Sequence, residues 1–310
     1  MLSQSGLRTT GDIPTHPSLA GAAIPVLSVS REAQRLVCGL DAHGRRLGRF
    51  RRAIDLLIDE QLLAVVTPEI GDGPFNVVVR ALPRSPLPRR FVVRPGARGC
   101  DLGPWHLQFG PRTRVWDARP PWSRLAFDAA ALRAVREVVS EAARTGRSPL
   151  VGAPGQAHPR VRALRQALGQ DVEALSGAAA DLAGWGPGLT PSGDDYLAGL
   201  MLGLWSVSFG HTQTLDREQT LVSRVSSCRA DLCDRIYQAA ASRTHRISRA
   251  FLKAARDGLA DARWHALLRA LASGEPSNVR RAAETVLAFG ATSGFDMLLG
   301  FWHVHATCNA

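Results

Sequence analysis

Two short segments in the C-terminal half of the chain carry nearly the same residues, and both place hydroxyl and carboxylate side chains at a fixed spacing. The first, residues 188–200, reads GLTPSGDDYLAGL, and the second, residues 290–301, reads GATSGFDMLLGF. When Pro191 is omitted, the two align as Gly-x-Thr-Ser-Gly-x-Asp-x-Leu-x-Gly. A duplication of this kind predicts that both copies serve one site or one packing contact.

Each copy has the spacing of a capped helix N-terminus. Ser192 is followed three residues later by Asp195, and Ser293 is followed by Asp296. In a capping box, the serine side chain accepts a backbone N–H of the first helical turn, and the acidic residue reaches back to the N–H of the serine. Capping alone would explain these four residues, and this purely structural interpretation stays open.

Capping leaves the threonine before each serine and the glycine after it unexplained. Glycine has a poor helix propensity, but it lets another group approach the backbone closely. A second glycine, Gly199 or Gly300, follows each aspartate after four residues and therefore lies on the same helix face. We predict that two helices, 193–209 and 294–306, pack closely and bring their N-termini to one polar pocket.

Such a pocket would favour a particular class of ligand. Helix N-termini and hydroxyl groups suit a carboxylate or a phosphate. The neighbouring aspartates would repel a bare anion, but they could accept N–H groups of an amide or ureide. We therefore expect a small ligand that combines a carboxylate or phosphate with amide N–H groups. No cofactor is assigned, although a divalent cation such as magnesium, held by the aspartates, is an alternative.

The residues assigned to this site come from both copies and from two further segments. The candidate catalytic residues are Asp194, Asp195 and Asp296. The candidate substrate-binding residues are Gly188, Thr190, Ser192, Gly193, Thr244, Ser248, Thr292, Ser293, Gly294 and Asn76. Thr244 and Ser248 would form a third wall of the site or, alternatively, a solvated capped turn. Asn76 would bind substrate or make a local backbone hydrogen bond at the start of its strand.

Composition and charge limit the classes of partner. The 310 residues carry 38 basic and 27 acidic side chains, a net charge of +11, and Lys253 is the only lysine. Because the arginines are spread along the chain and only two tyrosines are present, no nucleic-acid partner is predicted. A positive field that attracts small anionic substrates fits the same charge. The densest basic segment, 43–52, is expected to be a solvated loop or, alternatively, a patch that steers anions or docks a subunit.

Cysteines and apolar segments suggest a cytoplasmic protein with no membrane partner. Five scattered cysteines show no zinc-ligand spacing or disulfide framework, and free thiols suit a reducing cytoplasm. The first thirty residues lack a signal-peptide pattern. The longest apolar run, 196–209, is shorter than the roughly 20 residues of a membrane-spanning helix. No GxSxG, Walker A, Rossmann or HExxH motif occurs, which removes the common hydrolase, kinase and dehydrogenase classes.

The pattern of residues changes near position 123 and predicts an α+β fold. Before it, β-branched and aromatic segments between Pro/Gly turns indicate a β-rich N-terminal domain, 1–122, of which 1–30 is poorly defined. After it, helical periodicity indicates an all-helical domain, 123–310, that carries both copies. The expected strands are 35–40, 62–66, 75–80, 91–93 and 105–109. The expected helices are 123–144, 159–169, 171–183, 193–209, 215–241, 245–257, 259–272, 276–289 and 294–306.

The segment 188–195, GLTPSGDD, is long enough to be recognisable. The chain resembles the AllH-like family, a bacterial family formerly catalogued as a domain of unknown function and now associated with a subunit of oxamate carbamoyltransferase. The resemblance is strongest across 184–200. It extends more loosely to 244–252, 290–300 and 73–76.

The resemblance implies a carbamoyltransferase subunit of anaerobic allantoin degradation, a branch of purine catabolism. The reaction implied is phosphorolysis of oxalurate to oxamate and carbamoyl phosphate, or its reverse, in a complex with partner subunits that include an FdrA-like protein. These substrates combine a carboxylate or phosphate with amide or ureido N–H groups. Two alternatives remain: a non-catalytic scaffold or ligand-sensing subunit, and a metal-dependent hydrolase built on the aspartate cluster.

Overall fold

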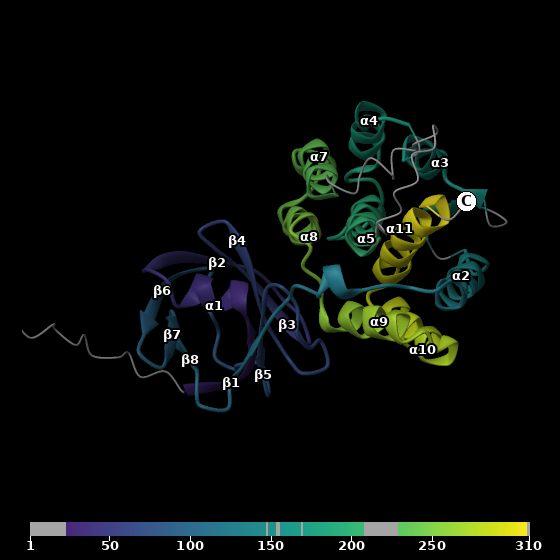
Figure 1. Cartoon of the computed structure of the whole chain (residues 1–310). Helices are drawn as coiled ribbons and strands as arrows, with labels where there is room; N and C mark the ends of the chain where they lie inside the picture. Colours follow the sequence, from purple (N-terminus) through teal and green to yellow (C-terminus); the bar gives the residue numbers. More distant parts are fainter. Residues whose placement is uncertain (1–22, 147, 153–155, 169, 208–228, 309–310) are drawn as a thin grey trace, which may run out of the picture.

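The computed structural model describes residues 23–146, 148–152, 156–168, 170–207 and 229–308. Strands occupy the N-terminal part and helices the C-terminal part, so the α+β fold predicted from the sequence is confirmed (Figure 1). The N-terminal strands are β1 (Ala23–Ser30), β2 (Ala42–Arg49), β3 (Ala53–Ile58), β4 (Gln61–Val66), β5 (Asn76–Val79), β6 (Arg90–Gly96), β7 (Gly99–Leu102), β8 (Trp105–Gln108) and β9 (Arg114–Trp116).

These strands form one sheet that closes on itself. Neighbouring strands follow the order β5-β4-β3-β2-β6-β7-β8-β1, and β1 also pairs with β5, which completes a barrel. The ninth strand, β9, pairs with the second half of β1, beyond the residues that pair with β8. Alternate residues of β3, such as Ile54, Leu56 and Ile58, are buried among apolar side chains inside the barrel, as the period of two in a strand requires.

Two N-terminal segments differ from the expectation. Residues 35–40 do not form a strand, because α1 (Arg31–Val37) begins where the Ser30 hydroxyl accepts the N–H of Ala33. The basic segment 43–52 is not a loop for most of its length, because β2 pairs antiparallel with both β3 and β6.

The helices are α2 (Ala129–Ala143), α3 (Pro159–Ala167), α4 (Val172–Leu182), α5 (Ser192–Ser206), α7 (Arg229–Ala241), α8 (Arg246–Arg256), α9 (Ala262–Ser273), α10 (Pro276–Leu287) and α11 (Ser293–Cys308). Each corresponds to an expected helix. The first begins later than expected, because residues 122–124 form a 3-10 turn and Asp128 caps α2. Residues 215–228 of the expected helix 215–241 lie outside the described residues. A short hairpin, β10 (Val151–Gly152) and β11 (Gln156–Ala157), precedes α3.

Apolar side chains collect in two large clusters. One fills the barrel, and the other lies among the helices around α5. Every residue of α5 except Trp205 is buried, and Figure 1 shows α5 beside α11, with α7 and α8 on its other side. Since a buried helix needs apolar side chains all around, the polar residues at the start of α5 stand out.

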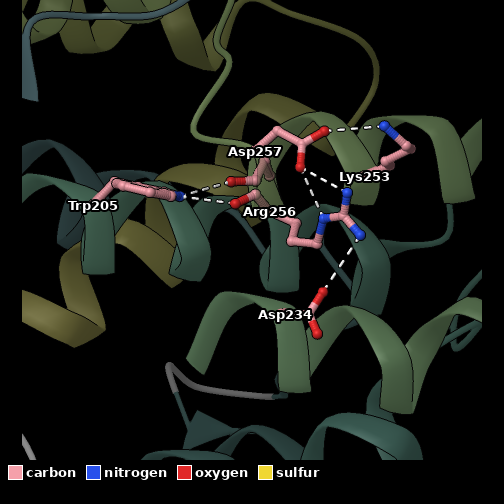
Figure 2. Close-up of polar contacts among 6 residues, drawn as sticks. Trp205, Asp234, Lys253, Arg256 and Asp257 are labelled. Carbon is pink, nitrogen blue, oxygen red and sulfur yellow. Dashed lines mark hydrogen bonds and ion pairs between the residues drawn. The ribbon is translucent and has the colours of Figure 1, made fainter. Parts of the chain in front are cut away.

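Ion pairs and hydrogen bonds fix α8 against its neighbours (Figure 2). The Arg256 guanidinium contacts Asp234 in α7 and Asp257, the residue that follows α8. Lys253 also pairs with Asp257. The indole N–H of Trp205, in α5, donates to the carbonyls of Ala255 and Arg256. These contacts anchor the C-terminal end of α8 to α5 and α7.

Hydrogen bonds to backbone carbonyls join the barrel, and the segment that follows it, to the helices. The indole N–H of Trp122 donates to Gly258 O at 2.8 Å, and Ala260 N donates to Ala118 O at 2.9 Å. Ala262 N, at the start of α9, donates to the carbonyl of Asp72 in the barrel. Among the described residues, no helix is both long and apolar enough to cross a membrane.

Candidate functional site

The helices α5 and α11 pack so closely that only glycine fits at their contact. A Cβ atom added to Gly199 would lie 1.8 Å from Met297 O, and one added to Gly300 would lie 2.1 Å from Tyr196 O. Gly199 and Gly300 are equivalent positions of the two copies, and so are Tyr196 and Met297. The contact is therefore reciprocal, and the predicted close packing of the two helices is confirmed.

The hydroxyl groups of the two copies pair across this contact. Thr190 Oγ1 lies 3.2 Å from Ser293 Oγ, and Ser192 Oγ lies 3.4 Å from Thr292 Oγ1. The threonine of each copy thus contacts the serine of the other, as an approximate twofold relation between the copies requires. We call these four side chains the hydroxyl cluster.

The predicted capping boxes are wrong. Pro191, not Ser192, is the N-cap of α5, no side chain caps that helix, and Ser192 is its first helical residue. Ser293 is likewise the first residue of α11. Each serine hydroxyl faces the threonine hydroxyl of the other copy instead of capping its own helix. At α5, the carbonyl oxygen of Pro191 accepts the first-turn amides of Asp194 and Asp195.

The glycines after the serines allow close approach, but the group that approaches belongs to the chain itself. A Cβ on Gly193 would lie 2.0 Å from Leu182 O, and one on Gly294 would lie 2.0 Å from Val286 O. The amide of Gly193 donates to Trp185 O at 2.8 Å, and that of Gly294 donates to Phe289 O at 2.9 Å. These two amides are therefore not free for an anion, contrary to the expectation of exposed N–H groups there.

Asp195 and Asp296 are buried beside the hydroxyl cluster. Each has one carboxylate oxygen, Oδ2, without a hydrogen-bond partner. Burial raises the pKa of Asp195 to about 7; the nearby carboxylate of Asp296 adds to this rise, and the hydroxyls of Ser293 and Thr190 oppose it. Burial also raises the pKa of Asp296, to about 6. Near neutral pH, the pair can therefore hold one proton.

Ser148 belongs to this site although its local sequence gives no indication of it. It lies between the expected helices 123–144 and 159–169, where the sequence suggested no site residue. Its hydroxyl donates to Asp296 Oδ1 and accepts the N–H of Leu150 at 3.1 Å. Three hydroxyls, those of Ser148, Ser192 and Thr292, lower the pKa of Asp296 against the effect of burial. Asp296 thus has more hydroxyl donors than Asp195.

Asp194 faces a different part of the fold. Its carboxylate accepts the N–H of Gly184 at 2.8 Å, the hydroxyl of Thr244, and the hydroxyl of Ser248 at 2.7 Å. Thr244 and Ser248 therefore meet Asp194 rather than the hydroxyl cluster. These contacts tie the start of α5 to the start of α8 and to Gly184, in the loop between α4 and α5.

Two of the proposed substrate-binding residues lie at the surface or in the barrel. Gly188 is exposed and has φ of 103°, a conformation that glycine adopts readily, in the loop before α5. Asn76 begins β5, and its side-chain amide donates to Gly71 O at 2.8 Å. This local backbone hydrogen bond is the alternative that the sequence left open for Asn76.

A cavity of about 370 Å³ opens beside the second copy. Ser148 and Thr292, two of the side chains that adjoin Asp296, line it. The rest of the lining comes from α2, α10, the first turn of α11, β10 and nearby loops: Val138, Glu141, Ala142, Ala143, Thr145, Val151, Glu284, Leu287, Ala291 and Phe295. A small molecule in this cavity could reach the hydroxyls beside the buried carboxylates.

No group of three or more His, Cys, Asp or Glu side chains suited to a metal ion occurs within the described ranges. The two buried histidines of α11 are engaged separately: His303 Nδ1 lies 2.8 Å from the Tyr196 hydroxyl, and His305 Nε2 lies 2.9 Å from Ser206 Oγ. Burial lowers the pKa of His303 to about 3 and that of His305 to about 4, so both are neutral at pH 7.

Comparison with known families agrees with the motif. Residues 182–305 match the family model described as oxamate carbamoyltransferase subunit AllH. This range contains both copies of the duplicated segment and all the helices from α5 to α10. No solved structure matches the chain significantly. The resemblance predicted from GLTPSGDD is thereby confirmed: the part of the chain that builds the hydroxyl cluster is AllH-like.

Proposed function

We propose that the chain is a subunit of a carbamoyltransferase that handles oxamate or oxalurate together with carbamoyl phosphate or phosphate. The proposal is supported by the AllH match over 182–305, which includes the hydroxyl cluster, Asp195 and Asp296. The observation that carries it is the pair of buried carboxylates, each with a free oxygen, beside four hydroxyls at two adjoining helix N-termini.

The two carboxyl groups suit different halves of such a ligand. Asp296 has three hydroxyl neighbours that favour its ionised form, so it is the better candidate to accept an amide N–H. Burial and the nearby carboxylates of Asp296 and Asp194 raise the pKa of Asp195, so it is the better candidate to hold a proton and donate it to a carboxylate or phosphate oxygen. Two acidic groups in different surroundings are a common arrangement for acid and base roles.

Carbamoyl transfer needs this kind of positioning more than it needs a nucleophilic side chain. In the synthetic direction, the amide nitrogen of oxamate attacks the carbonyl carbon of carbamoyl phosphate, a C–N bond forms, and the C–O bond to phosphate breaks. The nitrogen loses a proton and phosphate leaves. An ionised Asp296 would orient the amide NH2 of oxamate and take up that proton, while hydroxyls and a protonated Asp195 would stabilise developing negative charge.

Partner subunits are part of the proposal. The family description names a subunit, so we propose that the active assembly contains further chains, with an FdrA-like protein among them. Partner residues would complete the binding of the phosphate group, because the amides of Gly193 and Gly294 are already used within the chain.

The decisive experiment is an activity assay of the purified assembly. Phosphate release from carbamoyl phosphate is measured with and without oxamate for the wild type and Asp195→Asn, with Asp181→Asn at the exposed end of α4 as the control. We expect Asp195→Asn to reduce the oxamate-dependent rate by about 100-fold and the control to leave it unchanged. Equal rates for folded Asp195→Asn and wild type would contradict the proposal.

A ligand-sensing subunit without catalysis is the second candidate. One observation favours it: the four hydroxyls already bond to one another in pairs, at 3.2 and 3.4 Å. In that case, oxamate would still bind the isolated chain in a titration, and Asp195→Asn would weaken this binding. The turnover of the saturated assembly would then be the same for both proteins, which separates the two candidates.

A further inference from the structure

Four arginines surround a hollow on the barrel side of the molecule. The hollow measures about 840 Å³ and is lined by Arg45, Leu47, Arg89, Arg90 and Arg246. Arg45 and Leu47 lie in β2, Arg90 begins β6 with Arg89 just before it, and Arg246 begins α8. The hollow therefore spans the barrel and the helical part of the chain.

Three of these arginine side chains have no polar partner among the described residues. Within the part of the chain that the structure describes, the side chains of Arg45, Arg89 and Arg90 make no hydrogen bond or ion pair. Arg89, Arg90 and Arg246 are exposed, and Arg45 is half-buried. Bringing like charges together without a counter-charge is unfavourable, so folding does not explain why these guanidinium groups share one hollow.

The fourth arginine shows which chemical group the hollow accepts. Arg246 Nη1 contacts Glu60 Oε2 at 2.9 Å. Glu60 lies in the tight turn between β3 and β4, where both Asp59 and Glu60 have positive φ, at 43° and 63°. Both side chains of the pair are more than half exposed, so water screens the pair and a competing carboxylate can displace Glu60.

We propose that this arginine-lined hollow docks an acidic segment of a second protein, in which several Asp or Glu carboxylates lie close together along the chain. Guanidinium groups bind carboxylates through paired hydrogen bonds. The net charge of +11 favours an acidic partner and accelerates its association. A segment with several carboxylates can engage all four arginines at once, whereas a single small anion would occupy little of 840 Å³.

The lining argues against nucleic acid. Single-stranded nucleic acid is held by aromatic side chains on which bases stack, and none of the five lining residues is aromatic. The proposal does not depend on the reaction proposed above, because none of the lining residues belongs to the hydroxyl cluster or adjoins the buried carboxylates. The same face does, however, include the first residue of α8, the helix whose Ser248 holds Asp194.

The test measures binding of a fluorescein-labelled octaglutamate peptide to the full-length chain by anisotropy. The test variant is Arg89→Glu/Arg90→Glu, and the control is Arg162→Glu/Arg165→Glu on α3, which has the same change in net charge. Both control arginines are exposed, and Figure 1 shows α3 well away from β2 and β6. We expect the test variant to weaken binding about tenfold and the control about twofold or less. Glu60→Gln should strengthen binding, because it releases Arg246.

Three results would overturn the proposal. Equal weakening by the test and control variants would mean that only net charge matters. Stronger binding of inorganic phosphate than of octaglutamate, lost in the test variant, would assign the hollow to a small anion. Preferred binding of a single-stranded oligonucleotide, lost in the test variant, would assign it to nucleic acid. Circular dichroism of each variant checks folding, and Arg89→Gln/Arg90→Gln replaces the charge reversal if that variant does not fold.

Discussion

Gly199 packs directly on the backbone carbonyl of Met297, and a Cβ atom at position 199 would lie only 1.8 Å from that oxygen. The oxygen belongs to a buried helix and cannot move without displacing α11. The equivalent contact in the other copy, between Gly300 and Tyr196 O, repeats the same geometry. The duplicated glycines are therefore what lets two helix N-termini meet, and the hydroxyl cluster depends on them.

Replacement of Gly199 by alanine should destabilise the protein strongly. We expect the free energy of unfolding in urea to fall by about 3 kcal/mol, because the added methyl group forces α5 and α11 apart. Gly177→Ala is the matched control: a Cβ there meets no atom within 4 Å, in the interior of α4. That change should stabilise the protein by about 0.5–1 kcal/mol. Equal effects of the two substitutions would show that the close contact is absent.

Asp195 should make a pH-dependent contribution to stability of a defined sign. Its pKa is raised to about 7 in the folded chain, so between about pH 4 and pH 7 the folded state holds a proton that the unfolded state releases. Stability from this group is therefore greatest at low pH and falls by about 1.4 kcal/mol per pH unit across that window. Above pH 7 the contribution no longer changes.

Comparison with Asp195→Asn isolates this contribution. The buried neutral histidines His303 and His305 have lowered pKa values, so they act with the opposite sign between about pH 4 and pH 6.5. They are present in both proteins and cancel in the difference. We expect the variant to gain stability relative to the wild type as pH rises from 4 to 7, measured by urea unfolding at several pH values. A constant difference would show that Asp195 titrates normally.

Loss of the Asp194 carboxylate should release α8 from α5. Asp194→Ala leaves the Gly184 amide and the hydroxyls of Thr244 and Ser248 without their acceptor, and we expect a loss of about 2–4 kcal/mol in stability. Hydrogen exchange should accelerate at the start of α8. Asp181→Ala, at an exposed position of α4, is the control. If Ser248→Ala costs as much in the Asp194→Ala background as in the wild type, the two side chains are not coupled.

Removal of the Ser148 hydroxyl should raise the pKa of Asp296 further, because one of the groups that lowers it is lost. In the assembled enzyme, the acid limb of the pH–rate profile of Ser148→Ala should shift to higher pH, whereas Ser140→Ala, at an exposed position of α2, should not shift it. A lower rate with an unchanged profile would assign Ser148 a packing role only.

Local patterns in the sequence predicted a large part of this fold. Helical periodicity indicated every described helix after α2 to within a few residues, and the GLTPSGDD segment indicated the family and the start of α5. The glycines four residues after Asp195 and Asp296 predicted the close contact of α5 and α11 correctly. These features were predictable because helix periodicity and small-residue spacing are properties of neighbours in the chain.

Closure of the barrel could not be predicted in the same way. The strand signals at 62–66 and 105–109 were recognised, but β1 and β2 were not. Strand β1 lies within residues 1–30, which the sequence left poorly defined, and β2 is rich in arginine and glycine. Pairing of β1 with β5 and β8 depends on segments that are distant in the sequence. Such contacts follow from topology rather than from local propensity.

The sequence by itself located the starts of the two central helices to within one residue and indicated that glycine lies where they contact each other. Only the tertiary structure decided what their side chains do. Ser-x-x-Asp spacing is the same for a helix cap and for a cross-helix contact. The serine of each copy contacts the threonine of the other copy, about 100 residues away in the sequence, because the two helices pack together. Ser148 joined Asp296 for the same reason: packing brought a distant hydroxyl to a buried carboxylate, which local spacing does not encode.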